Sequence, residues 1–397
     1  MSNQLDILAL EPFYGGARRH MLETVLRCSR HRWTLLKLPP RRMERRLAVA
    51  ASWFAEQLSR HWSGRVDVLF TSEAMNLASL YRLVPAVAGL PSVVYFHENQ
   101  MTGVGPAAAS AHGRANAAPA PGSSQLPSDA ITRAIAPPLV APPTQAHEVD
   151  VELVNLNTAA AATEIWFNSS YHLHSFMAAV TQLVARHQEL SARNPMAQLS
   201  AKAFVVPPPI DLNLVPHVIA QGKVPLRDPR AIFVDTRNAH LRILNAALAE
   251  LASRGEQFRL ITVGPVEDLS PIWPRRTISE VDDAAHVQGL LECGVVLSVR
   301  PGAGCDLQVV RGLQAGCRPL LPREGMYSDL LPPHLHEYCL YDFNVDGLSN
   351  QLQDAINPLV PWSPPDLRAV LKQFEAIAAT RLFDERLSHL AAGHATR

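Results

Sequence analysis

Residues 6–28 read DILALEPFYGGARRHMLETVLRC, and this stretch decides the fold. It consists of an apolar run from Asp6 to Leu10, a glycine pair at Gly15 and Gly16, and a segment whose apolar residues recur at helical spacing. A buried strand, a glycine-bearing turn and a helix in this order form the first unit of a parallel α/β sheet. Glycines there let backbone N–H groups approach an oxygen or a phosphate at the start of the helix, while a purely structural tight turn is the alternative.

The alternation of strand and helix continues in two series. In the first, apolar runs at 67–72, 93–96 and 164–170 predict further strands, with helical patterns between them. A second series begins at 231–237 and returns to a strand at 258–265. Two such series predict an α/β protein of two Rossmann-like, doubly wound domains that face a cleft, with ligands bound beyond the carboxyl ends of the strands.

The domain boundaries follow from breaks in this alternation. Residues 102–150 are dominated by Ala, Pro, Gly and Ser, a composition that cannot offset its own ordering entropy, so we expect a disordered insertion. Strands are predicted on both sides of it, so it interrupts one domain. The expected units are an N-terminal domain at 1–212 that contains this insertion, a C-terminal domain at 213–365, and a helical segment at 366–397 that can cross back.

Composition excludes several classes of protein. The 36 basic and 36 acidic residues cancel, and the apolar runs are shorter than the ~20 residues of a membrane span, so we expect no membrane partner. The first residues lack the basic start of a secretory signal, which favours a cytoplasmic protein. Five cysteines without a CxxC pair predict reduced thiols, and the spacing of Cys293, Cys305 and Cys317 fits no common zinc site, so we expect no metal.

Local charge is less even than the total. Between Arg18 and Arg46 the chain carries ten basic residues against two acidic ones. This predicts a basic face near the N-terminus that can meet a polyanion, and an ordinary solvated helix face is the alternative.

Two further places carry residues suited to chemistry. His97, Glu98, Asn99 and Gln100 directly follow the apolar run VVYF, where His and Glu can act as acid, as base or as contacts to sugar hydroxyls. The alternative is a solvated junction between strand and loop.

In the second series, two turns contain residues that can hold a diphosphate. Arg237 ends a predicted strand and Arg242 lies one turn into the next helix, while Gly302 and Gly304 can expose N–H donors. Surface arginines beside structural turns are the alternative.

The strings EPFYGGARRH, LPPRR, DVLFTSEAMNLA, VVYFHENQ and WFNSSYHLHSF occur in this order. Together they resemble the N-terminal domain of the tRNA-queuosine alpha-mannosyltransferase family, whose members have the two-domain GT-B architecture. The resemblance implies transfer of mannose from GDP-mannose, with retention at the anomeric carbon, to queuosine in the anticodon of aspartate tRNA. The partners are then queuosine-containing tRNA and the nucleotide sugar, and no cofactor is expected beyond this donor substrate.

The resemblance also implies roles for individual residues. His97 and Glu98 would be the catalytic residues beside the mannosyl ring. The donor would be bound by Gly15, Gly16, Arg237 and Arg242, to which the turn described above adds Gly302 and Gly304. The tRNA acceptor would be contacted by Arg18, Arg19, Arg41, Arg42 and Asn99, largely through phosphates.

The C-terminal half departs from the pattern of this family. Ala303 and Arg311 stand where relatives have two glutamates that contact the donor sugar and the ribose. We expect Asp306, from the same turn, to take over the contact to the donor. The departure keeps two alternatives open: a catalytically inactive relative that binds tRNA or a partner protein, and a glycosyltransferase with another nucleotide sugar or a non-RNA acceptor.

Overall fold

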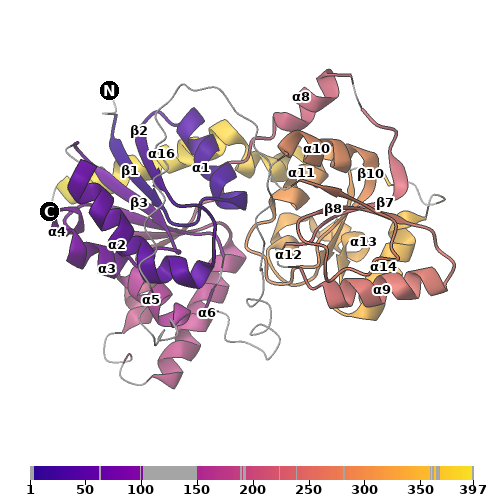
Figure 1. Ribbon diagram of the computed structural model, residues 1–397, viewed down its shortest axis with the longest axis horizontal. Helices are drawn as coiled ribbons and strands as arrows, with labels where there is room; N and C mark the ends of the chain where they lie inside the picture. Colours follow the sequence, from indigo (N-terminus) through magenta and orange to yellow (C-terminus); the bar gives the residue numbers. More distant parts are fainter. Residues whose placement is uncertain are drawn as a thin grey trace, which may run out of the picture.

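Two parallel six-stranded sheets, one in each half of the chain, organise the computed structural model (Figure 1). The structure describes residues 4–61, 64–98, 100–101, 150–187, 190, 194–222, 224–237, 239–279, 282–357, 359, 362–363 and 367–395. The expected disordered insertion at 102–150 and the expected tRNA contact Asn99 therefore lie outside the described residues, apart from Asp150 at the end of the insertion.

The first sheet has the strand order β2-β1-β3-β4-β5-β6. All neighbours pair in parallel, for example with Leu8 of β1 opposite Leu69 of β3. Its strands are β1 (Asp6–Glu11), β2 (Arg32–Lys37), β3 (Val68–Ser72), β4 (Ser92–Phe96), β5 (Glu164–Phe167) and β6 (Ala203–Val205). Because the strands are parallel, their carboxyl ends share one edge of the sheet, and His97 and Glu98 follow β4 at this edge.

Helices cover both faces of the first sheet. Leu8 and Leu10 pack with residues of α2 (Met43–His61), α3 (Leu77–Leu83), α5 (Val151–Ala161) and α6 (Ser170–Arg186). The alternate residues Ile7 and Ala9 point to the other face and pack with α1 (Gly16–Cys28) and α16 (Ala376–Ala395). The short helices α4 (Pro85–Ala88) and α7 (Pro195–Ser200) complete this half.

The second sheet has the strand order β12-β11-β10-β7-β8-β9, again all parallel. Its strands are β7 (Asp228–Asp235), β8 (Arg259–Val263), β9 (Arg275–Ile278), β10 (Cys293–Leu297), β11 (Arg318–Pro322) and β12 (Leu340–Tyr341). On one face lie α9 (Leu241–Ser253) and α14 (Val345–Ile356), and on the other α8 (Leu214–Ala220) and α10 (Asp283–Glu292). The remaining helices are α11 (Leu307–Ala315), α12 (Tyr327–Leu330), α13 (His336–Cys339) and α15 (Arg368–Leu371).

The chain passes between the halves twice, and the two passages touch. Going out, the Ile210 backbone N–H donates to the Phe374 carbonyl at 2.7 Å, and Ile210 forms a parallel bridge with Glu375 on the way back. After this point α16 packs against α1, far from the sheet that precedes it in sequence (Figure 1). The domain limits predicted at 212, 213 and 365 stay predictions.

The fold class predicted from the sequence is confirmed by the two doubly wound sheets. Strand β9 was not predicted, because Arg275–Ile278 is polar and lies at an edge of its sheet, where residues are only partly buried. Among the described helices, none combines the length and the apolar character needed to cross a membrane.

Candidate functional site

Residues from both halves meet at the carboxyl ends of the strands. A Cβ atom on Gly304, in the turn after β10, would lie 2.7 Å from Asn168 Oδ1 and 3.0 Å from His172 Nδ1 at the start of α6. A Cβ atom on Gly302, whose φ is +74°, would lie 3.5 Å from the Tyr171 hydroxyl. The glycine turn of the second half therefore packs directly on the first half, beside the residues that follow β4 and β5.

A buried carboxylate, Glu73, organises the first half of the site. Its oxygens accept the backbone N–H groups of His97 and Glu98, both at 3.2 Å, and it forms an ion pair with the Arg18 guanidinium. Burial raises the pKa of Glu73, against the lowering effect of Arg18. One carboxylate thus fixes the backbone after β4 and holds the arginine.

Arg18 is in consequence an interior residue. It is 5% exposed, because it packs between Glu73 and the ring of Phe13, with Glu98 Oε2 at 4.0 Å. Burial alone would lower its pKa, but Glu73 and Glu98 together raise it, so the guanidinium stays charged. Arg18 thus lies in the interior of this structure, and its predicted contact with tRNA phosphates stays a prediction.

His97 lies next to this ion pair. Its ring packs on Tyr95 at 4.7 Å between centroids, its carbonyl accepts from Asn168 Nδ2 at 2.8 Å, and Nε2 has no hydrogen-bond partner among the described residues. Burial lowers the pKa of His97 well below its usual value, and the charge of Arg18 lowers it further. The imidazole is therefore neutral at pH 7, and its Nε2 is a buried polar atom without a hydrogen-bond partner among the described residues.

Glu11, at the end of β1, is a second buried acid beneath the glycine turn. One of its oxygens accepts from the Phe13 N–H at 2.7 Å and from the Ser72 hydroxyl at 3.0 Å. Burial raises its pKa to about 7, against the lowering effect of Arg18. Its carboxyl group therefore titrates near neutral pH.

The turn at Gly15 and Gly16, in the first half, faces an arginine of the second half. Gly16 has a φ of +52°, and a Cβ atom there would lie 4.0 Å from Arg237 Nη1. Gly15 is extended and packs on Pro40, where a Cβ atom would approach to 2.5 Å. The structure thus brings together Gly15, Gly16 and Arg237, whereas Arg242 is an exposed residue of α9.

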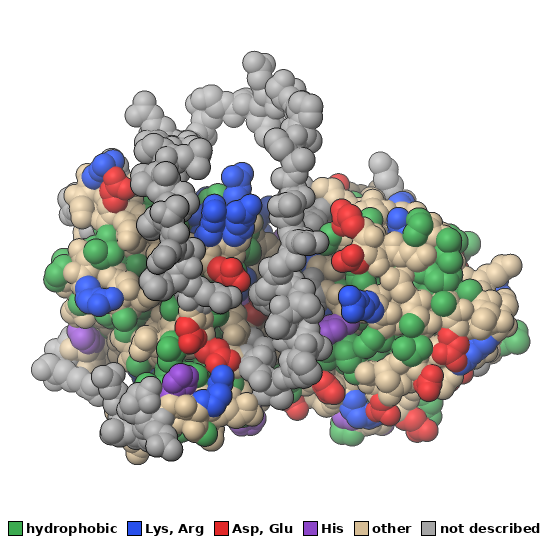
Figure 2. Space-filling model, turned by 60° about the horizontal axis from the view of Figure 1, so that its bottom comes forward, with side chains coloured by type: hydrophobic (Ala, Val, Ile, Leu, Met, Phe, Trp, Pro, Cys, Tyr) green, Lys and Arg blue, Asp and Glu red, His purple; other side chains and the backbone are tan. Residues whose placement is uncertain are grey.

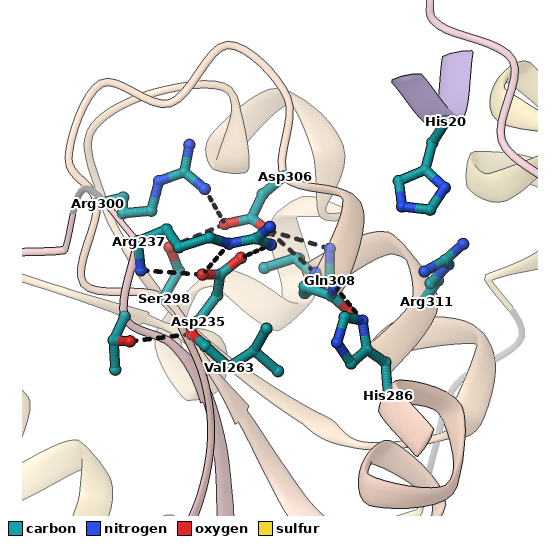
Figure 3. A network of polar contacts seen from close by, with 12 residues as sticks. His20, Asp235, Arg237, Val263, His286, Ser298, Arg300, Asp306, Gln308 and Arg311 are labelled. Atoms are coloured by element: carbon teal, nitrogen blue, oxygen red, sulfur yellow. Dashed lines mark hydrogen bonds and ion pairs between the residues drawn. The ribbon is translucent and has the colours of Figure 1, made fainter. Parts of the chain in front are cut away.

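Arg237 and Arg300 follow the neighbouring strands β7 and β10, and each lies beside an aspartate (Figure 3). Arg237 Nε and backbone N donate to Asp235 Oδ1 at 2.9 and 3.0 Å. Arg300 Nη1 lies 3.8 Å from Asp306 Oδ2. Asp306 is also the N-cap of α11, and its carboxylate accepts hydrogen bonds from the Ser298 and Tyr327 hydroxyls. These contacts within the protein account for its position without a bound nucleotide sugar. Its predicted contact with the donor stays a prediction.

Arg311 takes part in a contact between the halves. Its Nη1 lies 2.9 Å from Asp283 Oδ1, and the same oxygen lies 3.3 Å from His20 Nε2 on α1. Burial lowers the pKa of His20 to about 4, so the imidazole is neutral at pH 7. Arg311 therefore pairs with Asp283, while Ala303 is buried in an apolar cluster.

The basic face is only partly as predicted. Arg41 and Arg42 are exposed, and Arg19 pairs with Glu23 on α1 at 3.0 Å. Figure 2 shows a group of Lys and Arg side chains on the N-terminal half, close to its boundary with the other half. Whether these residues meet tRNA stays a prediction.

Sequence reasoning missed Glu73, Glu11 and Arg300. Glu73 directly follows the buried strand β3. Polar residues directly after a buried strand were the signal that indicated His97 after β4, and the same signal indicates Glu73. Arg300 lies in the SVRPGAG turn, of which only Gly302 and Gly304 were predicted to bind a ligand. Within the described part of the chain, His, Cys, Asp and Glu do not gather in a group of three able to hold a metal ion.

Solved structures share this architecture. HepE of Anabaena, in complex with UDP and glucose, superposes with a TM-score of 0.60 at 14% identity, covering 97% of this chain and 100% of that one. Sucrose-phosphate synthase from Thermosynechococcus elongatus gives a TM-score of 0.64 at 11% identity, with 98% and 100% covered. At these identities the likeness shows the fold, which is the two-domain GT-B fold of glycosyltransferases.

Sequence comparison identifies the family. The family model of the tRNA-queuosine alpha-mannosyltransferase N-terminal domain matches residues 6–132 and 139–210. The tRNA-queuosine alpha-mannosyltransferase of Drosophila melanogaster is 21% identical over 351 residues, which is 82% of this chain and 81% of that protein. The chain therefore belongs to the tRNA-queuosine alpha-mannosyltransferase family of glycosyltransferases.

Proposed function

We propose that this protein transfers mannose from GDP-mannose to queuosine in the anticodon of aspartate tRNA, with retention at the anomeric carbon. The observation that carries the proposal is the His97 neighbourhood, because it joins the residues that match the family to the place where both halves meet. In this reading the first half receives the tRNA and the second half the nucleotide sugar.

Each half supplies a different part of the chemistry. The lowered pKa of His97 keeps its imidazole neutral, so Nε2 can exchange a hydrogen bond with a sugar hydroxyl without adding charge. The backbone at Gly15 and Gly16 approaches the diphosphate, while Arg237, Arg242, Gly302 and Gly304 bind it from the other side. Stabilising the departing GDP and holding the acceptor at the anomeric carbon then provide the rate acceleration.

The residues around the acceptor are assigned by exposure. Arg19, Arg41 and Arg42 are proposed to contact tRNA phosphates, which fixes the position of the anticodon without reading its sequence. Glu98, whose side chain is 45% exposed beside Arg18, is proposed to face the acceptor hydroxyl.

The test is a transfer assay. The protein is incubated with queuosine-containing aspartate tRNA and GDP-mannose, and the digested nucleosides are weighed by mass spectrometry. Queuosine carrying one added hexose supports the proposal, and the same tRNA lacking queuosine serves as the control. If product forms only with another nucleotide sugar, such as UDP-glucose, that sugar and not GDP-mannose is the donor.

A second candidate function is that of an inactive relative that binds tRNA. It is favoured by the second half, where Ala303 is buried among apolar side chains and Arg311 is held by Asp283. Salt-dependent binding of the tRNA without any hexose product, across a panel of nucleotide sugars, would support this function over transfer.

A further inference from the structure

Two arginines lie together at the carboxyl ends of neighbouring strands in the second half. Arg237 follows β7 and Arg300 follows β10, and these strands pair directly through Phe233 and Val296. Asp235 hydrogen-bonds Arg237 and is also among the charges that act on Arg300. Figure 3 shows both guanidinium groups above the ends of these strands.

The N-terminus of the nearby helix α11 is capped by a side chain of the protein itself. Asp306 Oδ1 accepts the backbone N–H groups of Gln308 and Val309 at 3.2 and 3.3 Å, which caps α11 with the chain's own carboxylate. Asp306 is 4% exposed, and its other oxygen, Oδ2, accepts hydrogen bonds from the Ser298 and Tyr327 hydroxyls at 3.2 Å. Positive charge at this place therefore comes from arginines and not from helix N–H groups.

The side chain of Arg237 packs closely on a glycine of its own half. A Cβ atom on Gly264, whose φ is +101°, would lie 2.6 Å from Arg237 Cγ, so the stem of the arginine needs the glycine beneath it. A Cβ atom on Gly16 of the opposite half would lie 4.0 Å from Arg237 Nη1, so the two halves approach each other at this arginine. Glu98 of the first half is also among the charges that raise the pKa of Arg300.

We propose that Arg300 acts with Arg237 as a two-arginine site for the diphosphate of a nucleoside diphosphate donor, with Asp235 and Asp306 as the counter-charges that hold both guanidinium groups in its absence. The inference rests on the proposed function, which supplies such a donor. Two forked guanidinium groups match the oxygens of a diphosphate, because each can donate two parallel hydrogen bonds to neighbouring oxygens. The leaving diphosphate would thereby be neutralised by Arg300 as well as by Arg237.

The test measures binding of inorganic pyrophosphate and of GDP by calorimetry. For Arg300→Gln we expect about tenfold weaker binding of both, since one charged hydrogen-bonding group is lost. Arg300→Lys keeps the positive charge but not the forked guanidinium, so we expect its affinity for both ligands to fall less than that of Arg300→Gln. Arg323→Gln is the matched control, because Arg323 follows β11 of the same sheet and pairs with Asp342 at 3.1 Å but is 52% exposed; its binding should equal that of the wild type.

A second variant distinguishes a ligand site from mere structure. Asp306→Asn keeps a good N-cap but removes the negative charge beside Arg300, so we expect pyrophosphate to bind several times more tightly. A structural role of the Arg300–Asp306 pair alone would instead leave binding unchanged and lower the temperature of unfolding in both variants.

The outcomes separate this inference from the proposed function. Wild-type transfer with undiminished GDP binding in a folded Arg300→Gln variant overturns the two-arginine site and leaves the function standing. Weakened binding in that variant, with no mannose transfer by the wild type, upholds the site and overturns the function. A wild-type protein that binds neither pyrophosphate nor GDP overturns the site.

Discussion

The two halves share one architecture and differ in how they hold charge. In the first half, Glu73 and Arg18 form an ion pair sealed beneath the sheet edge, with the backbone of His97 and Glu98 fixed to it. In the second half, Arg237 and Arg300 are 28% and 20% exposed and each rests on a local aspartate. The first arrangement fixes a geometry, whereas the second keeps cations that a ligand can take over.

The largest expected effect comes from breaking the sealed pair. Glu73→Ala should lower the free energy of unfolding by about 3–5 kcal/mol, because the buried Arg18 charge loses its nearest carboxylate and keeps only Glu98 at 4.0 Å as an ion-pair partner. Asp235→Ala in the second half should cost about 1 kcal/mol, since solvent reaches Arg237. Urea denaturation of both variants measures the difference, and equal losses would refute the contrast between the halves.

His97→Ala tests whether the fixed geometry serves catalysis. We expect the turnover of mannose transfer to fall about 100-fold or more, the usual effect of removing a group that exchanges protons or hydrogen bonds at the reacting centre. The affinity for tRNA, measured by filter binding, should change little. His174→Ala, an exposed position on α6, is the control. Full turnover in His97→Ala would show that the active site lies elsewhere.

Glu11 gives the first half a pH dependence. Its pKa is raised from 4.5 to about 7 by burial, so between these values the folded carboxyl keeps a proton that the unfolded one has lost. The free energy of unfolding should therefore fall as pH rises through this window, by up to about 3 kcal/mol. Relative to Glu11→Gln, the wild type should lose stability between pH 4.5 and 7, which denaturation at several pH values measures. A constant difference would contradict the burial of this acid.

The smallest effect is expected on the basic face. Replacing Arg41 and Arg42 together by Gln should weaken tRNA binding and reduce its salt dependence by about two counterions, without changing turnover at saturating tRNA. Arg230→Gln, an exposed arginine at the amino end of β7, is the control. Unchanged salt dependence in the double variant would place the tRNA elsewhere.

The sequence predicted the local units well, because each depends on neighbours within a few residues. The strand, glycine turn and helix at the start, and the polar residues after β4, lie where they were expected. The burial of Arg18 could not be predicted in this way, since its partner Glu73 lies 55 residues further along the chain. The contact of Arg311 with Asp283 and His20 likewise joins separate elements, and no spacing rule reports it.

The return of the chain's end to its beginning has a practical consequence. Phe383, Leu387 and Leu390 of α16 cover the same face of the first sheet as Met21 and Val25. A fragment that stops after β6 would expose this apolar surface to water, and we would expect such a fragment to aggregate. The first half is therefore not a separable module, because a helix that follows the second half in sequence covers part of its apolar surface.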